Sequence, residues 1–150
     1  MAHWLMKSEP AVFGIDDLER QRRAPWEGVR NYQARNFIRD GMKKGDLAFL
    51  YHSGCEEPAI AGIMEICRKA YPDPTQFDRK SPYYDPASTK AEPRWLMVDV
   101  CFRRRLKRPV TLTELKGHAP LASLALVKRG NRLSVMPVSA AEWEFILSLE

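Results

Sequence analysis

The sequence predicts an α+β fold in which a small β-barrel has helices packed around it. At least five apolar runs have the length and residue types of strands, whereas only about three segments have helical character. The connections are too short for repeated βαβ crossovers, which argues against a doubly wound sheet. With 150 residues and 45% hydrophobic residues, the chain can bury one core, and we expect a single domain over residues 1–150.

The first expected strand spans residues 3–6 and ends where a proline stops regular pairing. Lys7 and Ser8 lie at its exit, so they can reach something bound at the rim of the sheet, whereas Trp4 fits the core better. A short helix is expected from Gly14, because acidic residues in its first turn complement the helix dipole.

The stretch from Trp26 to Asp40 holds a high density of groups suited to recognition. Trp26 follows a proline in a basic, turn-prone segment, so we expect its ring on a loop, where it can pack or stack on a ligand. An amphipathic helix is expected from Asn31, its N-cap, to Gly41 or Gly45. Arg30 directly precedes this helix start, which makes an anion site there plausible on physical grounds.

The remaining strands are expected at residues 47–51, 59–67 and 95–102, with weaker ones at 124–127 and 132–135, where Pro137 stops the last. Between them, the proline-rich segment 71–93 is too long for an ordinary connection, and loops of this length often serve a site. Residues 111–115 suggest a helical turn. Ser139 and Glu142 have capping-box spacing ahead of a terminal helix.

The formal net charge of +5 favours a polyanionic partner, although many basic proteins bind nothing acidic. Six arginines fall between residues 20 and 39, and a second basic block spans 103–108. This block could equally be the solvated end of a hairpin. The three cysteines form neither a zinc motif nor a disulfide framework. We expect no cofactor, no metal and no membrane contact, and a cytoplasmic protein, or a nuclear one if the source is a eukaryote.

Several motifs, in a consistent order along nearly the whole chain, resemble the EVE domain family, a PUA-like branch related to the YTH readers of methylated adenine. They are WLMKSEP, GVRNYQARNF, GDLAFLYHS, YPDPTQFD, SPYYDP, PRWLMVDV and RLSVMPV. The resemblance implies a PUA-like mixed β-barrel of about five to six strands flanked by short helices. It also implies a non-catalytic reader of modified nucleobases, which works on nucleic acid, beside restriction or defence partners in some cases, and as a monomer.

Matching motif by motif, the resemblance implies a base-binding pocket and no catalytic residues. The implied pocket residues are Lys7, Ser8, Trp26, Val29, Arg30, Asn31, Tyr32, Ser53, Tyr84, Ser134, Val135, Met136 and Pro137. Met136 stands where many relatives have glutamine, which removes one hydrogen-bonding group. Phosphate contacts are expected from Arg35, Arg39, Arg103, Arg104 and Arg105. Such contacts hold a strand without reading its sequence.

These residue types suit the capture of a base. Trp26 and Tyr84 can supply stacking faces, and Asn31, Ser8 and Ser53 can hydrogen bond to a base edge. A plainer interpretation stays open, in which Asn31 only caps its helix, Ser53 satisfies a turn and Tyr84 packs under its loop.

A different function class also remains open, namely a nuclease or hydrolase of the PUA-like ASCH type. His52 with Cys55, or Lys7 with Glu9, would be its acid–base or nucleophilic pair. Neither pair has a third orienting group or an acidic cluster for a metal. A third interpretation, a small-metabolite or protein-binding module, would use the same pocket without the basic residues.

Overall fold

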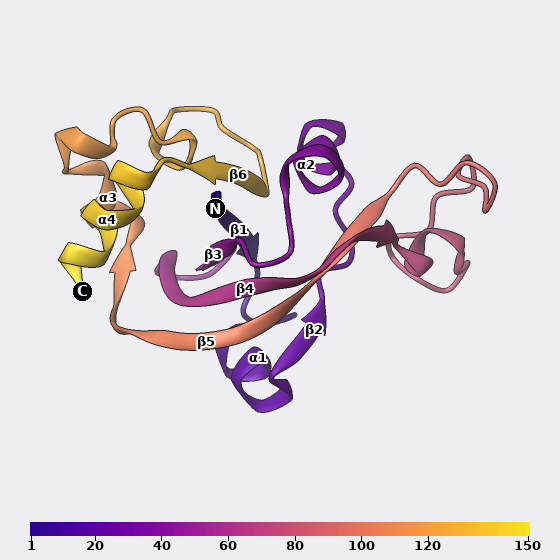
Figure 1. Ribbon diagram of the computed structural model, residues 1–150, viewed down its shortest axis with the longest axis horizontal. Helices are drawn as coiled ribbons and strands as arrows, with labels where there is room; N and C mark the ends of the chain where they lie inside the picture. Colours follow the sequence, from indigo (N-terminus) through magenta and orange to yellow (C-terminus); the bar gives the residue numbers. More distant parts are fainter.

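A computed structural model describes all residues, 1–150, and has the expected α+β architecture (Figure 1). Six strands form one mixed sheet in the order β2-β5-β4-β3-β1-β6, in which only β1 and β3 are parallel. The strands are β1 His3–Ser8, β2 Arg23–Pro25, β3 Leu47–His52, β4 Ala59–Pro72, β5 Leu96–Thr111 and β6 Val135–Val138. The sheet is open, because the edge strands β2 and β6 do not pair, so the expected barrel is incomplete.

Four short α-helices surround the sheet: α1 Ile15–Gln21, α2 Tyr32–Asn36, α3 Leu112–Lys116 and α4 Ala140–Leu149. A π-helical turn η1 Phe37–Gly41 continues α2, and 3-10 turns occur at η2 Pro74–Phe77, η3 Ala119–Leu121 and η4 Ala125–Val127. The caps agree with the sequence: Asn31 Oδ1 accepts from Ala34 N, and Ser139 and Glu142 form the expected capping box. No helix is long and apolar enough to span a membrane.

Several segments differ from the sequence-based expectation. Strand β2 was not predicted, because three residues carry almost no periodicity. Residues 124–127 form η4 and no strand. Strand β6 begins at Val135 and continues past Pro137, which is tolerated because β6 is an edge strand and a proline there need not donate to a neighbour.

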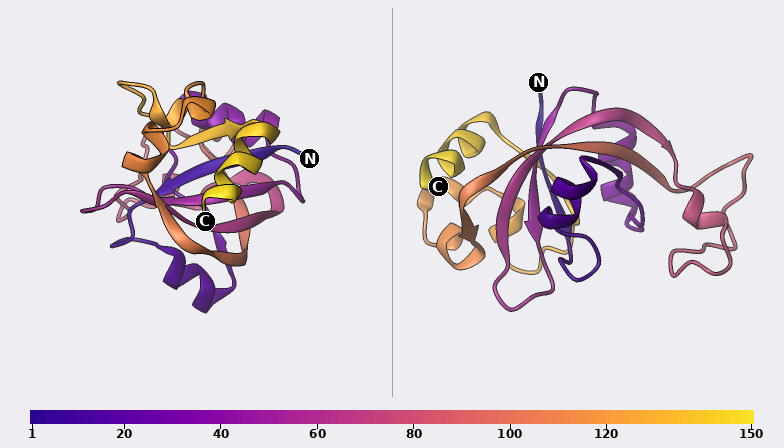
Figure 2. Two further views of the ribbon diagram at one scale, coloured as in Figure 1. Left: turned by 90° about the vertical axis from the view of Figure 1, so that its left-hand side faces the viewer. Right: turned by 90° about the horizontal axis from the view of Figure 1, so that it is seen from below.

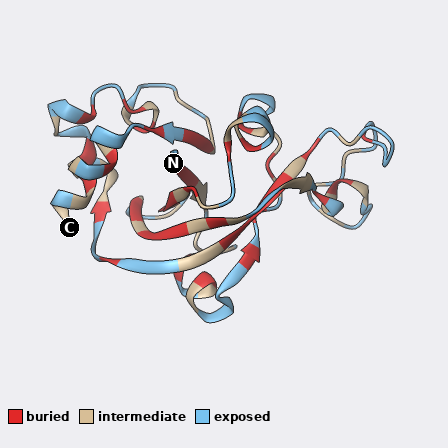
Figure 3. Cartoon of the chain, viewed as in Figure 1, coloured by how far each residue is buried: buried red, intermediate tan, exposed pale blue.

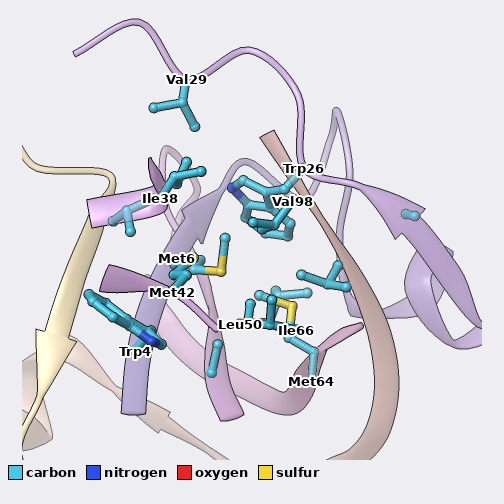
Figure 4. Packing of buried hydrophobic residues seen from close by; sticks show 14 of the residues in the cluster. Trp4, Met6, Trp26, Val29, Ile38, Met42, Leu50, Met64, Ile66 and Val98 are labelled. Carbon is cyan, nitrogen blue, oxygen red and sulfur yellow. The ribbon is translucent and has the colours of Figure 1, made fainter. Parts of the chain in front are cut away.

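Two hydrophobic clusters form the core. Figure 3 shows where buried residues lie along the strands and helices. One contains Trp4, Trp26, Ile38 and Val98 and lies beneath α1 and η1 (Figure 4). The other contains Phe49 and Trp143, whose rings stack at a centroid distance of 3.9 Å under α4. Strands β4 and β5 are longer than predicted and run as a twisted ribbon to the segment 73–95, which projects from the body (Figure 2).

Candidate functional site

A cavity of about 380 Å³ opens where the sheet fails to close. Pro25 and Trp26, at and after the end of β2, form one wall, and Arg132 and Ser134, just before β6, belong to another. The end of β1 and Tyr83 of the projecting segment complete it. Its volume falls in the range of ligand pockets, about 300–1,000 Å³. Of the residues expected in a pocket, six line this cavity: Lys7, Ser8, Trp26, Val29, Ser53 and Ser134.

Trp26 lines the cavity but is also a core residue. Its side chain belongs to the first hydrophobic cluster, with only 6% of the residue exposed, and it meets Phe13 edge-on at 6.2 Å. Its backbone N–H donates to the Val98 carbonyl at 2.8 Å, which extends the β2–β5 pairing by one residue. Trp26 thus lies just after β2, outside any helix or strand, as expected, but the expectation that a loop tryptophan is poorly placed to be a core residue was wrong.

Tyr83 lies against Gly28, and the sequence had pointed to its neighbour Tyr84 instead. A Cβ atom on Gly28 would lie 2.6 Å from Tyr83 Cζ, and Gly28 has a φ of +85° that favours glycine. Tyr84 is outside the cavity lining and partly exposed. Adjacent tyrosines in a loop cannot be told apart without the fold, because no periodicity says which one turns inward.

Gly28→Ala is expected to lower the free energy of unfolding by about 1–3 kcal/mol through the strained backbone, and to push the Tyr83 ring from its place. Gly130→Ala is the matched control, because Gly130 also has a positive φ, +77°, but has no atom within 4 Å of an added Cβ. Urea unfolding of both variants measures the difference. If Gly28→Ala costs no more than Gly130→Ala, the contact with Tyr83 is not tight.

The buried carboxylate of Asp73 connects Gly28 in the cavity wall to the projecting segment 73–95. Asp73 is fully buried and accepts hydrogen bonds from the Gly28 N–H at 2.8 Å and from the N–H and hydroxyl of Thr75. It also pairs with Arg30 at 3.2 Å. Burial acts to raise the pKa of Asp73, but these hydrogen bonds and the Arg30 charge together hold it below its usual value.

Arg30 therefore supports the cavity from behind and does not line it. Its guanidinium donates to the Tyr83 carbonyl at 2.8 and 3.0 Å and to the Thr75 hydroxyl, and lies over the rings of Tyr83 and Trp95. Each N–H group of the Arg30 guanidinium therefore already has an acceptor within the chain. Arg30 was expected to contact a ligand because an arginine before a helix start is a common anion site, and here a buried aspartate occupies that role.

Other expected pocket residues also have structural partners outside the cavity lining. Asn31 caps α2, and the Tyr32 ring stacks on Trp95 at 4.8 Å. Val135 and Met136 are fully buried, one in each hydrophobic cluster, because successive residues of β6 face opposite sides of the sheet. Pro137 is exposed on this edge strand. The cavity also includes residues that the sequence did not assign to the base-binding pocket: Glu9, Val12, Phe13, Pro25, Glu27, Gly28, Tyr83 and Arg132.

The charged side chains that line the cavity are Lys7, Glu9, Glu27 and Arg132. Burial lowers the pKa of the Lys7 ammonium from its ordinary value. Partial burial, followed by the nearby Asp73 carboxylate, raises the pKa of Glu27. Burial disfavours the charged form of both groups, and for Glu27 burial and the Asp73 charge outweigh the opposing attraction of Arg30.

The basic block on β5 is paired with carboxylates. Arg103 meets Glu65 at 3.1 Å, Arg104 meets Glu150 at 2.6 Å, and Arg105 binds Asp16 and Glu19 of the α1 region. Arg39 likewise pairs with Asp40, and Arg35 donates to the Arg94 carbonyl and lies over the Tyr32 ring. These interactions count against the expected role of all five arginines as phosphate ligands, because each cation already has an acceptor.

The two side-chain pairs considered for catalysis differ in placement. The His52 Nε2 atom accepts a hydrogen bond from the Ile15 N–H at 3.1 Å, at the start of α1, and burial lowers the pKa of His52. The Cys55 thiol contacts the His52 carbonyl at 3.8 Å, so no thiol–imidazole hydrogen bond is formed. Lys7 and Glu9 both line the cavity without an ion pair between them. Nowhere do three or more His, Cys, Asp or Glu side chains gather as a metal site would require.

Comparison with known proteins places this fold and cavity in context. A structure from Pseudomonas syringae is 51% identical, with a TM-score of 0.96 and 99% of both chains covered. Human thymocyte nuclear protein 1 is 48% identical over 99% of this chain and 74% of its own length. A crystal structure of the human protein, in complex with DNA containing 5-methylcytosine, has a TM-score of 0.95 and covers 99% of this chain and 97% of that one. Residues 2–149 match the EVE domain, and the chain belongs to the EVE domain family.

Proposed function

We propose that this protein is a non-catalytic reader that binds one modified nucleobase, a modified cytosine or a methylated adenine in DNA or RNA. The base would bind in the cavity where the sheet stays open between β2 and β6. The observation that carries the proposal is the composition of this cavity. Trp26 and Tyr83 line it together with four charged side chains and the hydroxyls of Ser53 and Ser134, none of which has a hydrogen-bonding partner in the chain. We further propose that it acts as a monomer.

The physical requirements of base capture support this proposal. A base taken out of its stack needs an aromatic face, and such a face contributes about 1–3 kcal/mol per base. Its edge must also meet hydrogen-bonding groups, for which Ser53 and Ser134 are suitable, since neither hydroxyl makes a hydrogen bond within the chain. The human relative crystallised with 5-methylcytosine DNA makes modified cytosine the first base to test.

The direct test is a binding series with short strands that differ at one position only. Fluorescence anisotropy would compare cytosine, 5-methylcytosine, adenine and N6-methyladenine in otherwise identical DNA and RNA strands. We expect one modified base to bind at least about tenfold more tightly than its unmodified parent. Equal affinity for all strands would contradict the proposal.

We propose that phosphate contacts come from three exposed cations before β6, Lys128, Arg129 and Arg132. None of the three forms an ion pair, and Arg132 reaches the cavity. Replacing all three with alanine is expected to reduce the slope of log affinity against log salt by about 2–3, close to one per lost phosphate contact. The Arg103–Arg105 triple alanine variant is the comparison and is expected to change the slope less. A larger change of the slope in the Arg103–Arg105 variant would contradict this and place the phosphate contacts on β5.

The rival proposal, a hydrolase or nuclease, is tested by product analysis. Modified and unmodified strands would be incubated with the protein, with and without Mg²⁺ or Zn²⁺, and examined by mass spectrometry. We expect unchanged strands, because the His52 imidazole already accepts from Ile15 N. Cleavage, deamination or loss of the modification that disappears in His52→Ala or Cys55→Ala would replace the reader proposal with the hydrolase one.

A further inference from the structure

An apolar turn lies at the mouth of the cavity. Residues 10–13, with the sequence PAVF, carry no charged side chain, and Val12 and Phe13 line the cavity. Val12 is 67% exposed, the largest exposed fraction of any large apolar residue after Met1. Single exposed apolar residues are common on protein surfaces. Val12 differs from them because it lies at the rim of a cavity of ligand size.

The backbone of this apolar turn is held in one conformation. The N–H groups of Val12 and Phe13 both donate to the Glu9 carbonyl, each at 2.9 Å. The Ser8 hydroxyl donates to the Phe13 carbonyl at 2.7 Å. The Phe13 ring packs against the first hydrophobic cluster and meets Trp26 edge-on. Val12 therefore projects into solvent from a fixed base, so it loses little conformational freedom when it contacts a partner.

The chemistry of the mouth differs from one side to another. Arg132 also lines the cavity, and with Lys128 and Arg129 it supplies exposed cations that suit phosphates. An aliphatic side chain has no affinity for a phosphate and no π-face on which an unpaired base can stack. Proteins that bind single strands use aromatic platforms, whereas apolar wedges are inserted by proteins that open a step of a duplex. Val12 therefore fits a base-paired nucleic acid better than a single strand.

A wedge has a definite role when a base leaves a duplex. Extrusion of the base breaks its pairing and its stacking, and it leaves a gap between the neighbouring base pairs. An apolar side chain that enters this gap restores contacts with those pairs. The cavity can take the extruded base while the adjacent turn, which lines the same cavity, reaches the gap.

We propose that the protein takes its base from a duplex and that Val12 is the wedge that enters the gap left by the extruded base. The substrate class is then base-paired nucleic acid. Val12 acts as a positioning residue, which touches the neighbouring pairs and not the bound base itself. This inference rests on the proposed function, because it concerns how the base reaches the same cavity.

The test compares a single strand with its own duplex. A short DNA strand with one 5-methylcytosine would be titrated by anisotropy, alone and paired with its complement. Val12→Ser is expected to weaken duplex binding at least about tenfold and to change single-strand affinity by less than about twofold, because only the duplex has a gap to fill. Val12→Leu should bind the duplex as wild type does. Since Val12 is exposed, urea midpoints of both variants should equal that of wild type.

Two controls separate a wedge from a general apolar contact. A duplex whose 5-methylcytosine faces a mismatched base is already weakly paired there, so the defect of Val12→Ser should shrink. Tyr84→Ser removes an exposed apolar side chain outside the cavity lining and should leave the ratio of duplex to single-strand affinity unchanged. In addition, 2-aminopurine beside the 5-methylcytosine should brighten when wild type binds the duplex, because its stacking is broken, and brighten less with Val12→Ser.

The outcomes distinguish the inference from the proposed function. If Val12→Ser binds the duplex as tightly as wild type, or loses single-strand affinity to the same extent, Val12 is not a wedge. Wild-type protein that binds the modified single strand but not its duplex would also overturn the inference and leave the reader function standing. Equal affinity of wild type for modified and unmodified strands would contradict the reader function, and the duplex-to-single-strand ratio of the variants would still decide the role of Val12.

Discussion

Trp26→Ala is expected to lower the free energy of unfolding by about 3–5 kcal/mol and to abolish most base binding. The first effect follows from burial, because only 6% of the residue is exposed and truncation of a buried tryptophan leaves a large cavity in the core. The second follows from its place in the pocket lining, where loss of a stacking face costs about 1–3 kcal/mol per base. Urea unfolding and anisotropy titration measure the two effects on the same preparation.

A milder pair of variants separates packing from recognition. Trp26→Phe and Trp143→Phe each replace a buried indole with a smaller ring, but Trp143 lies in the second hydrophobic cluster, stacked on Phe49. Both should fold, and only Trp26→Phe should weaken the binding of modified strands. If the two variants bind as wild type does, Trp26 is a core residue that does not contact the base.

Asp73→Ala is expected to be the most destabilising change in the loops, by about 3–5 kcal/mol, because it leaves the Arg30 guanidinium, whose side chain is only 21% exposed, without its carboxylate. It also removes the acceptor of the Gly28 N–H, so the wall against Tyr83 loosens and base binding should fall with stability. Chemical unfolding and binding would be measured together. Asp40→Asn, in the exposed pair with Arg39, is the control and should change stability little.

The pH dependence of stability gives this prediction a second readout. The folded-state pKa of Asp73 lies below its usual value of 3.8, so the unfolded chain takes up the proton first as pH falls. The stabilisation is complete above pH 3.8 and is lost as pH falls through the folded pKa. Asp73→Asn should therefore flatten the decline of stability in this acidic range. An unchanged decline would mean that other carboxylates dominate acid unfolding.

The sequence predicted the fold class because it depends on local signals. Apolar runs identified β1, β3, β4 and β5, and capping residues identified the starts of α2 and α4. Lys7 and Ser8 could be singled out because they lie at the exit of the first strand, whereas Ser53 followed from the resemblance of its motif; all three line the cavity.

The sequence could not predict which residues of the recognition stretch turn inward. Three of these residues have the expected functional groups but use them within the fold. Arg30 pairs with Asp73 and Tyr32 stacks on Trp95, both distant in sequence, whereas Asn31 caps the helix that follows it. Likewise, the arginines of β5 look like a free basic patch until the fold brings Glu65, Glu150 and α1 beside them. Whether such a residue is free to bind a ligand depends on partners distant in sequence, and a single sequence does not reveal those contacts.

The claim that a modified base enters the cavity between the edge strands β2 and β6 is tested most directly by locating the base. Two-dimensional ¹H–¹⁵N NMR spectra would be recorded during titration with a short strand that contains one 5-methylcytosine, and with the same strand containing cytosine. We predict that the modified base shifts the amide signals of Gly28, Ser53 and Ser134, three backbone sites around the cavity, more strongly than cytosine does. Tight binding with shifts confined to β5 or α4, and none at these three amides, would contradict it.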